Sequence, residues 1–505
     1  MLGFVPIFLL LGAAIAVAIL QFVPRGAGIA WIVAVLVSIV AWVMVIVMRS
    51  RLPFSFAGQF WINLGFKDLL PAFQIDIINW PFVLSICGIV AGALITSSFR
   101  IGLDSSNAEW AAVLAFGALA IFGCIASNIL TILFILGFVD LLELALIFFS
   151  KYEEDSVSSN LKFMIWHIAS LIIFVAAYGW QMSLTGTADD WNSIQLGPGF
   201  LIFAGCIIRL GLIPFFNLIG NPKKTPDGLY VTRNLTGFLI VISLILQLPF
   251  HPIESQWKPI ILVLLLITAI AASYRIARNE KRLNQIVMWQ VLIGSLISSE
   301  YILGYSGGGI FLAITIVSLY LILNLNYPVS AFSKTLGIIS LVSLSGLPFT
   351  PNSTGFSGFG WIGGFPGFTF LFPIIFIFYS SIRQILEKKN PENPLAERWS
   401  SIIAPAGLII PVITPWVVSL FWQPETHGLQ ISTPALIVTF AGLGLFLIWQ
   451  LKLFDFERIT KIIGPKYLVL SNKSFSFITD ISFSVDELVH TPFNFITNLF
   501  EGDGG

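Results

Sequence analysis

Apolar runs of about twenty residues recur along almost the whole chain, from Phe4 to Phe454. A run of roughly 18 or more apolar residues is long enough to cross the hydrocarbon core of a membrane as a helix. The pattern therefore predicts an all-α polytopic membrane protein. Fifteen such segments are predicted, near residues 4–23, 28–48, 77–99, 109–127, 129–149, 161–183, 197–220, 229–250, 257–277, 283–305, 307–327, 334–350, 362–386, 402–422 and 434–454.

The seventh segment carries a signal for a broken helix. It contains Pro214 and leads into a polar stretch that begins at Asn221 and Pro222. Proline removes a helix hydrogen bond, and irregular backbone at membrane depth needs protein or water around it. The sequence predicts a break between Ile213 and Leu229, with Pro214 and Pro222 at its ends. The freed backbone groups would be bound by Asn217, Asn221 or water. If the seventh and eighth segments are halves of one crossing, about fourteen crossings result.

A second interruption is predicted where segment 334–350 ends. The stretch Ser345–Asn352 contains Pro348 and Pro351 and follows an apolar run. Two interrupted helices in two halves of a chain are typical of transporters built from inverted repeats.

The character of the chain changes after residue 454, so a bundle over 1–454 and a tail over 455–505 are predicted. The tail is amphipathic between Phe475 and Phe500. It is expected to lie at the membrane interface or against partner subunits. An alternative is an ordinary surface helix on the loops of the bundle.

Composition excludes several classes of function. The chain is 57% hydrophobic and only 10% charged, whereas a soluble protein carries about 25% charged residues. A net charge of zero gives no signal for nucleic acid. The three cysteines and four histidines are too scattered for a predicted metal, haem or iron–sulfur site. We therefore expect no cofactor on this chain, apart from bound lipid.

The basic loops predict an orientation. With fourteen crossings, the loops 275–282, 383–398 and 452–466 fall on one side of the membrane. The positive-inside rule then places both termini in the cytoplasm, and a prokaryotic plasma membrane is the expected location. The segment from Phe4 to Val23 is interpreted as a retained first span.

Three charges at membrane depth are the first candidates for function: Asp140, Glu143 and Arg209. A charge in hydrocarbon is costly and normally faces the bundle interior. Asp140 and Glu143 are three residues apart, so they share one helix face, and one of two such close carboxyls can hold a proton. Arg209 is the expected partner of Asp140. It cannot release its proton, which favours a structural role for that pair.

Other polar groups in the predicted spans are weaker candidates. His167 could titrate, although a lone histidine is more often a hydrogen-bonded core residue. Gln290, Tyr320 and Asn324 could line a water path, or they could simply form hydrogen bonds across helices.

Several motifs resemble one family when taken in order. Phe138-Val139-Asp140 is similar to a helix-five motif that carries a glutamate. Leu161-Lys162-Phe163, Ala169-Ser170 and Ser183-Leu184-Thr185-Gly186 are similar to its sixth helix and the exit from it. The stretch Arg209–Phe216 resembles a Lys-x-x-x-x-Pro-Phe-His signature of a broken seventh helix.

Two later motifs continue the same order. Glu280-Lys281-Arg282-Leu283 with Val287-Met288-Trp289 is similar to an Asp-Leu-Lys-Arg-Leu-Leu-Ala-Tyr segment, and Leu344–Pro348 with Gly355-Phe356 is similar to a Leu-x-Gly-x-Pro…Gly-Phe stretch. Over residues 70–455 the chain resembles the antiporter-like membrane subunits of respiratory complex I and of Mrp-type cation/proton antiporters. The resemblance also implies fourteen crossings.

The departures from that family bear on function. Arg209 stands where the family has a lysine, and Phe216 where it has a histidine. The ranges 260–273, 314–325 and 362–382 contain no charge, although the family has ionisable groups in its middle and twelfth helices. The resemblance then implies a proton path that is broken in its second half.

The resemblance implies a membrane subunit of a complex I-like, redox-driven proton-translocating assembly of the NADH:quinone oxidoreductase type. Other membrane subunits would be its partners, and quinone and iron–sulfur centres would belong to them, because this chain shows no redox motif. Two alternatives remain: a non-conducting scaffold subunit and a stand-alone cation/proton antiporter. Since the second half is poor in ionisable groups, we expect little conduction through it.

Overall fold

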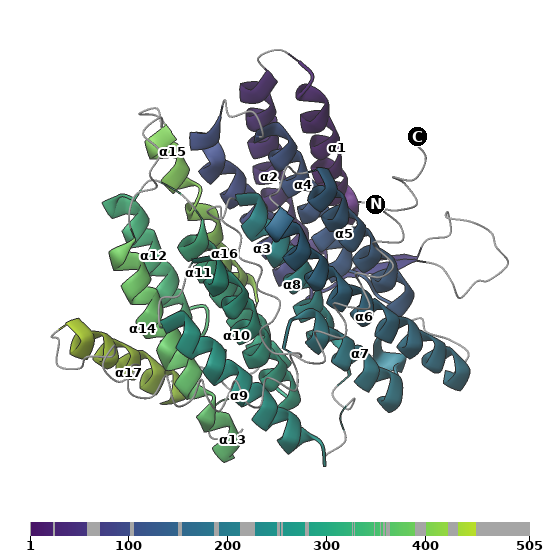
Figure 1. Cartoon of the computed structure of the whole chain (residues 1–505), viewed down its shortest axis with the longest axis vertical. Helices are drawn as coiled ribbons and strands as arrows, with labels where there is room; N and C mark the ends of the chain where they lie inside the picture. Colours follow the sequence, from purple (N-terminus) through teal and green to yellow (C-terminus); the bar gives the residue numbers. More distant parts are fainter. Residues whose placement is uncertain are drawn as a thin grey trace, which may run out of the picture. The chain divides into compact units, whose positions relative to one another are not determined.

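The computed structural model describes residues 2–450 except 24–25, 58–70, 102–105, 150–153, 186–190, 213–227, 250–252, 254–255, 278–281, 326, 328, 348, 354, 357–358, 360–363, 389–399 and 423–432. The described chain is almost entirely helical (Figure 1). Its α-helices are α1 Val5–Leu20, α2 Gly26–Met48, α3 Trp80–Thr96, α4 Ser106–Cys124, α5 Ile129–Phe149, α6 Glu154–Thr185, α7 Leu196–Arg209, α8 Gly228–Gln247, α9 Lys258–Ala277, α10 Arg282–Ile302, α11 Ser306–Asn324, α12 Ala331–Leu344, α13 Gly364–Thr369, α14 Leu371–Glu387, α15 Ser400–Ala406, α16 Ile409–Phe421 and α17 Thr433–Gln450.

These helices confirm the polytopic helical fold predicted from the apolar pattern. Each of the fifteen predicted segments contains at least one helix. Among the described residues, seven helices are long and apolar enough to cross a membrane, and the other apolar helices are shorter. The count of fourteen crossings stays a prediction. Short 3₁₀ turns flank several helices: η1 Leu2–Phe4, η2 Arg49–Arg51, η4 Ser97–Arg100 and η5 Trp191–Ser193.

A pair of short strands departs from the all-helical prediction. Strand β1 (Phe54–Ala57) pairs antiparallel with β2 (Ala72–Ile75). The other edge of β2 is bonded as well: the amide of Gln74 donates to the carbonyl of Ile125 at 2.8 Å, and Ser127 donates to Ala72 at 2.9 Å. The strands thus tie the loop before α3 to the turn between α4 and α5.

Helix packing follows the size of the side chains. On α2 the buried positions include Ala30, Ala34 and Ala41, whereas Leu36 and Val47 are exposed. Small residues let helix backbones approach closely, and large apolar residues suit the hydrocarbon of a bilayer. Helix α3 is buried along its whole length.

The predicted later interruption is confirmed at the end of α12. The helix stops at Leu344, and non-helical backbone follows, with positive φ angles at Gly346 (66°) and Phe349 (70°). The buried side chain of Asn352 donates from Nδ2 to the carbonyl of Leu344 at 3.1 Å. Thr439 on α17 donates to the carbonyl of Ser345 at 2.6 Å. These bonds satisfy the carbonyls that a broken helix leaves without donors.

The chain divides into two compact units, Met1–Leu443 and Gly444–Gly505. The division falls inside α17, and the described part of the second unit is the end of that helix. The predicted boundary at residue 454 stays a prediction, and the predicted amphipathic tail lies outside the described residues.

Candidate functional site

A buried ion pair joins the middle of α5 to the end of α7. Arg209 donates from Nη1 to Oδ2 of Asp140 at 3.1 Å, and its Nη2 donates to Oδ1. Both residues are buried, with 5% of Asp140 and 6% of Arg209 exposed. The predicted contact between them is confirmed. Such a two-bond geometry is the strong form of an arginine–carboxylate pair.

The local structure explains why Arg209 lies there. Helix α7 ends with the amide of Leu212 bonded to the carbonyl of Ile207, and that of Gly211 bonded to Ile208. Gly211 has a φ of 72°, which glycine adopts without strain, so this is a Schellman end. Arg209 is therefore in the last turn of α7, where the helix dipole favours a cation.

This helix end refines the predicted break. The seventh segment does leave helical geometry, but α7 ends at Arg209, before Pro214 is reached. The glycine-based helix end, rather than the proline, is what terminates it. The residues proposed to bind the freed backbone, Asn217 and Asn221, lie outside the described residues together with Pro214 and Pro222.

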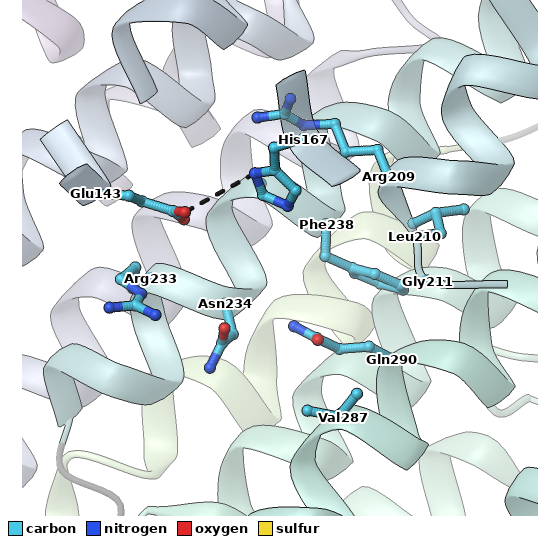
Figure 2. A pocket seen from close by; sticks show the side chains of 11 residues that line it. Glu143, His167, Arg209, Leu210, Gly211, Arg233, Asn234, Phe238, Val287 and Gln290 are labelled. Atoms are coloured by element: carbon cyan, nitrogen blue, oxygen red, sulfur yellow. Dashed lines mark ion pairs between the residues drawn. The ribbon is translucent and has the colours of Figure 1, made fainter. Parts of the chain in front are cut away.

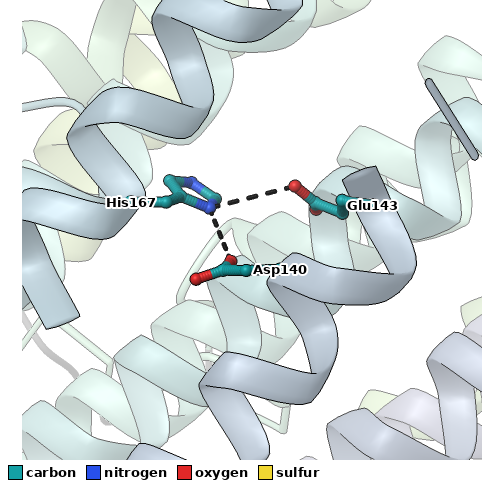
Figure 3. Close-up of side chains that lie close together, drawn as sticks. All are labelled: Asp140, Glu143 and His167. Carbon is teal, nitrogen blue, oxygen red and sulfur yellow. Dashed lines mark hydrogen bonds and ion pairs between the residues drawn. The ribbon is translucent and has the colours of Figure 1, made fainter. Parts of the chain in front are cut away.

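Helix α6 adds a third partner to the pair. Nδ1 of His167 lies 2.9 Å from Oδ1 of Asp140 and 3.8 Å from Oε2 of Glu143. Figure 3 shows the two carboxyls of α5 facing the same edge of the imidazole ring. His167 and Glu143 are 4% and 3% exposed. The structure thus brings together all four of the ionisable residues named from the sequence as site candidates.

A small cavity lies beside this cluster. Its volume is about 30 Å³, which is room for a very small number of water molecules. Glu143, His167, Arg209, Arg233, Asn234 and Gln290 are the polar residues that line it. They come from α5, α6, α7, α8 and α10, so five helices meet at this point (Figure 2).

Arg233 is a site residue that sequence reasoning missed. It lies in the first turns of α8, is 6% exposed, and lines the cavity. The sequence does indicate this residue, because Arg233 is the single charged residue in the predicted span 229–250, just as Arg209 is in the predicted span 197–220. The uncharged ranges 260–273 and 314–325 fall on α9 and α11, whereas Arg233 lies on α8.

The three neutral polar candidates, Gln290, Tyr320 and Asn324, do not lie together in the structure. Gln290 lines the cavity, and Figure 2 shows its amide turned toward Asn234. Tyr320 and Asn324 lie on α11, where Asn324 donates to the carbonyl of Tyr320 at 2.9 Å. The Tyr320 ring packs against Trp289 with centroids 6.4 Å apart. Of the three, only Gln290 is thus among the described residues that line this cavity.

The cluster has some features of a metal site. Asp140, Glu143 and His167 bring three potential ligand atoms within 4.8 Å of one another. Arg209, however, already donates to both carboxylate oxygens of Asp140, so a cation there would have to displace a guanidinium. The carboxylates and the imidazole can instead exchange protons, which an arginine effectively never does.

Comparisons with known proteins bear on the fold. No protein-family model and no curated protein sequence matches the chain. Its structure is similar to that of a chain in the Mrp complex from Dietzia sp. DQ12-45-1b, with a TM-score of 0.66 and 13% sequence identity. The match covers 93% of this chain and 60% of the Mrp chain, so this chain spans less than two thirds of that protein.

The fold is thus shared with a chain of a membrane complex. Together with the apolar helices, this identifies an integral membrane protein with the polytopic helical architecture expected from the sequence. At this level of identity the likeness establishes the fold and not the activity.

Proposed function

We propose that this chain is an antiporter-like subunit of a multisubunit membrane assembly, and that its buried cluster takes up and releases a proton. The fold shared with a chain of an Mrp complex supports the first part. The second part is carried by Glu143. Among the described residues its Oε2 has no hydrogen-bond partner, although the residue is 3% exposed and lines the cavity.

The two carboxyls of the cluster, Asp140 and Glu143, have different hydrogen-bond partners. Asp140 receives two donors from Arg209 and one contact from His167, so its charge is compensated whenever the arginine is in place. Glu143 lies 3.8 Å from Nδ1 of His167 and borders a water-sized space. A buried carboxylate oxygen without a donor, such as Oε2 of Glu143, is costly, and protonation at that oxygen removes the cost. Glu143 and His167 are therefore the members that exchange protons.

The nature of the assembly is a finer proposal. A redox-driven, complex I-like assembly would leave electron transfer, quinone and iron–sulfur centres to partner subunits. A cation/proton antiporter assembly would need no redox partner. The proteins that purify with the chain distinguish the two: quinone-oxidoreductase-like neighbours would favour the first, Mrp-like neighbours the second, and migration as a single chain after mild extraction would favour a stand-alone transporter.

Proton uptake into reconstituted vesicles tests the role of Glu143. The chain, with the subunits that accompany it, is placed in vesicles containing a pH-sensitive dye, and a membrane potential is imposed. Glu143→Gln is expected to slow uptake about tenfold or more, since a group that transfers protons typically contributes at least that much. Glu387→Gln is the matched control, because Glu387 is a half-exposed acid on α14 that pairs with Arg383. Equal rates for both variants would reject the proposal.

A scaffold role is the second candidate, favoured by the character of α11. That helix contains no charged residue, and all its residues from Gly308 to Asn324 are buried. Moving a charge through such a layer would cost several kcal/mol. In a redox-linked assembly the scaffold role predicts that Asp140→Asn leaves the proton yield per electron pair unchanged. A lower yield with the complex intact would exclude it.

A further inference from the structure

We infer that the neighbouring ends of α2 and α16 bind an anionic phospholipid. Arg49 and Arg51 would hold its phosphate, and its acyl chains would lie against the exposed apolar side chains of the two helices. Neither helix contributes a residue to the cavity beside Glu143, so this site is separate from the proton cluster.

Helices α2 and α16 lie side by side and run in the same direction. Trp42 on α2 donates from Nε1 to Oγ1 of Thr414 on α16 at 3.1 Å. Seven residues later on both helices, Nη2 of Arg49 donates to the carbonyl of Phe421 at 3.1 Å. Seven residues make about two helical turns, so the two contacts lie on one side of each helix. The two helices therefore end together, and the buried helix α3 packs against both.

The two arginines at this end have different surroundings. Arg49 is half-buried, bonded to the end of α16, and its Cζ lies 5.7 Å from the centre of the Trp80 ring. A cation is stabilised at the negative end of a helix, so Arg49 has a structural role. Arg51 is exposed and forms no hydrogen bond or ion pair with any residue that the structure describes. Its guanidinium is therefore available to a ligand that also reaches Arg49.

The exposed face of α2 leads directly to Arg51. Its large exposed side chains recur at helical spacing and form one apolar stripe: Ile29, Ile32, Leu36, Val40, Val43 and Val47. Arg51 follows four residues after Val47. On α16, Ile413 and Leu420 are exposed as well. Such side chains suit lipid tails, and a cation at the end of the stripe lies where a lipid carries its phosphate.

Charge complementarity favours a lipid with a net negative headgroup. Arginine presents a planar fork of N–H groups that matches the oxygens of a phosphate. Neither Arg49 nor Arg51 pairs with a carboxylate among the described residues, so both positive charges lack a counter-charge there. A phosphatidylglycerol headgroup supplies one, whereas a choline headgroup brings a second cation toward the arginines. The ligand expected here is thus phosphatidylglycerol or a lipid of the same charge.

Native mass spectrometry of the purified protein, with the subunits that accompany it, tests this site. The sample is titrated with phosphatidylglycerol and, separately, with phosphatidylcholine. Arg51→Gln should weaken the tightest phosphatidylglycerol binding about fivefold, the loss expected for one arginine facing an anionic lipid, and leave phosphatidylcholine binding unchanged. Arg383→Gln is the matched control, because it also removes one arginine charge but from a residue that pairs with Glu387. It should bind both lipids as the wild type does.

Four results would overturn the assignment. The first is unchanged phosphatidylglycerol affinity in Arg51→Gln, which tests the site even if Arg49→Gln does not fold. The second is equal weakening for both lipids, which would leave only an apolar surface. The third is loss of an accompanying subunit from Arg51→Gln with lipid binding retained, which would assign this face to a protein partner. The fourth is displacement of the lipid by inorganic phosphate, which would indicate a site for the free ion.

Discussion

Buried charge is handled differently in the helices α5–α8 and in the helices α11–α14. In the first region Asp140 and Arg209 meet inside the bundle, near the middle of α5. In the second region the cations lie at helix ends. Lys388, just after α14, donates from Nζ to the carbonyls of Ile322, Leu323 and Leu325 at the end of α11.

The second region uses its lysines to satisfy backbone. The last carbonyls of a helix have no partner within it, and the helix dipole makes that end negative. Lys388 fills this need for α11 and also lies 3.7 Å from the centre of the Tyr327 ring. Lys334 does the same for α14 through the carbonyl of Leu386 at 3.1 Å. Lys334 and Lys388 therefore have a structural role.

A buried charge is a candidate for function when titratable groups remain beside it after it is paired. In α5–α8 the pair leaves Glu143 and His167 beside a cavity. In α11–α14 the described basic residues hold helix ends or, as Arg383 does, pair with a neighbour one turn away. Glu300 in α10, between the two regions along the chain, is a fully buried acid, and its carbonyl accepts a hydrogen bond from the amide of Tyr305 at 2.9 Å.

The largest effect is expected from Asp140→Asn. It leaves Arg209 as an uncompensated buried cation that cannot release its proton, and breaking one side of such a pair costs about 3–5 kcal/mol. Arg209→Ala should cost less, because Asp140 can take up a proton, while Asp140→Leu with Arg209→Met should recover much of the loss. Folded protein in the membrane and the thermal unfolding midpoint in detergent measure this. Equal amounts of Arg209→Ala and Asp140→Asn protein would contradict it.

Lys388→Met should have an intermediate effect on stability. The variant keeps the length of the side chain but removes three hydrogen bonds to carbonyls and the contact with Tyr327. Loss of such charge-assisted bonds should lower stability by about 2 kcal/mol. The thermal midpoint should fall, and the pH dependence of proton uptake should stay that of the wild type. A changed pH dependence would mean that this region also handles protons.

Ser318→Ala should have the smallest effect. Pro415 lies inside α16 and has no amide hydrogen for the carbonyl of Pro411, and Ser318 on α11 donates to that carbonyl at 2.5 Å. Removing the hydroxyl leaves a buried acceptor unsatisfied, at a cost of about 1 kcal/mol. Thr315→Ala is the control, because Thr315 bonds only carbonyls of its own helix. Equal thermal midpoints for the two variants would show that α16 does not depend on this bond.

The helices were largely predictable because each span carries its own signal in about twenty apolar residues. The contact between Asp140 and Arg209 was predictable too, since either charge alone would be too costly at depth. Strand β2 was not, because its bonds to Ile125 and Ser127 join segments about fifty residues apart.

By itself the sequence determined that this chain is a helical membrane protein, where its helices lie, and that a few charges must be paired inside it. Only the tertiary structure decided that His167 joins Asp140 and that Arg233 and Gln290 share a cavity with Glu143. The reason is physical. Periodicity tells which face of a helix is buried, but the neighbour that this face meets depends on how helices of similar apolar character pack together.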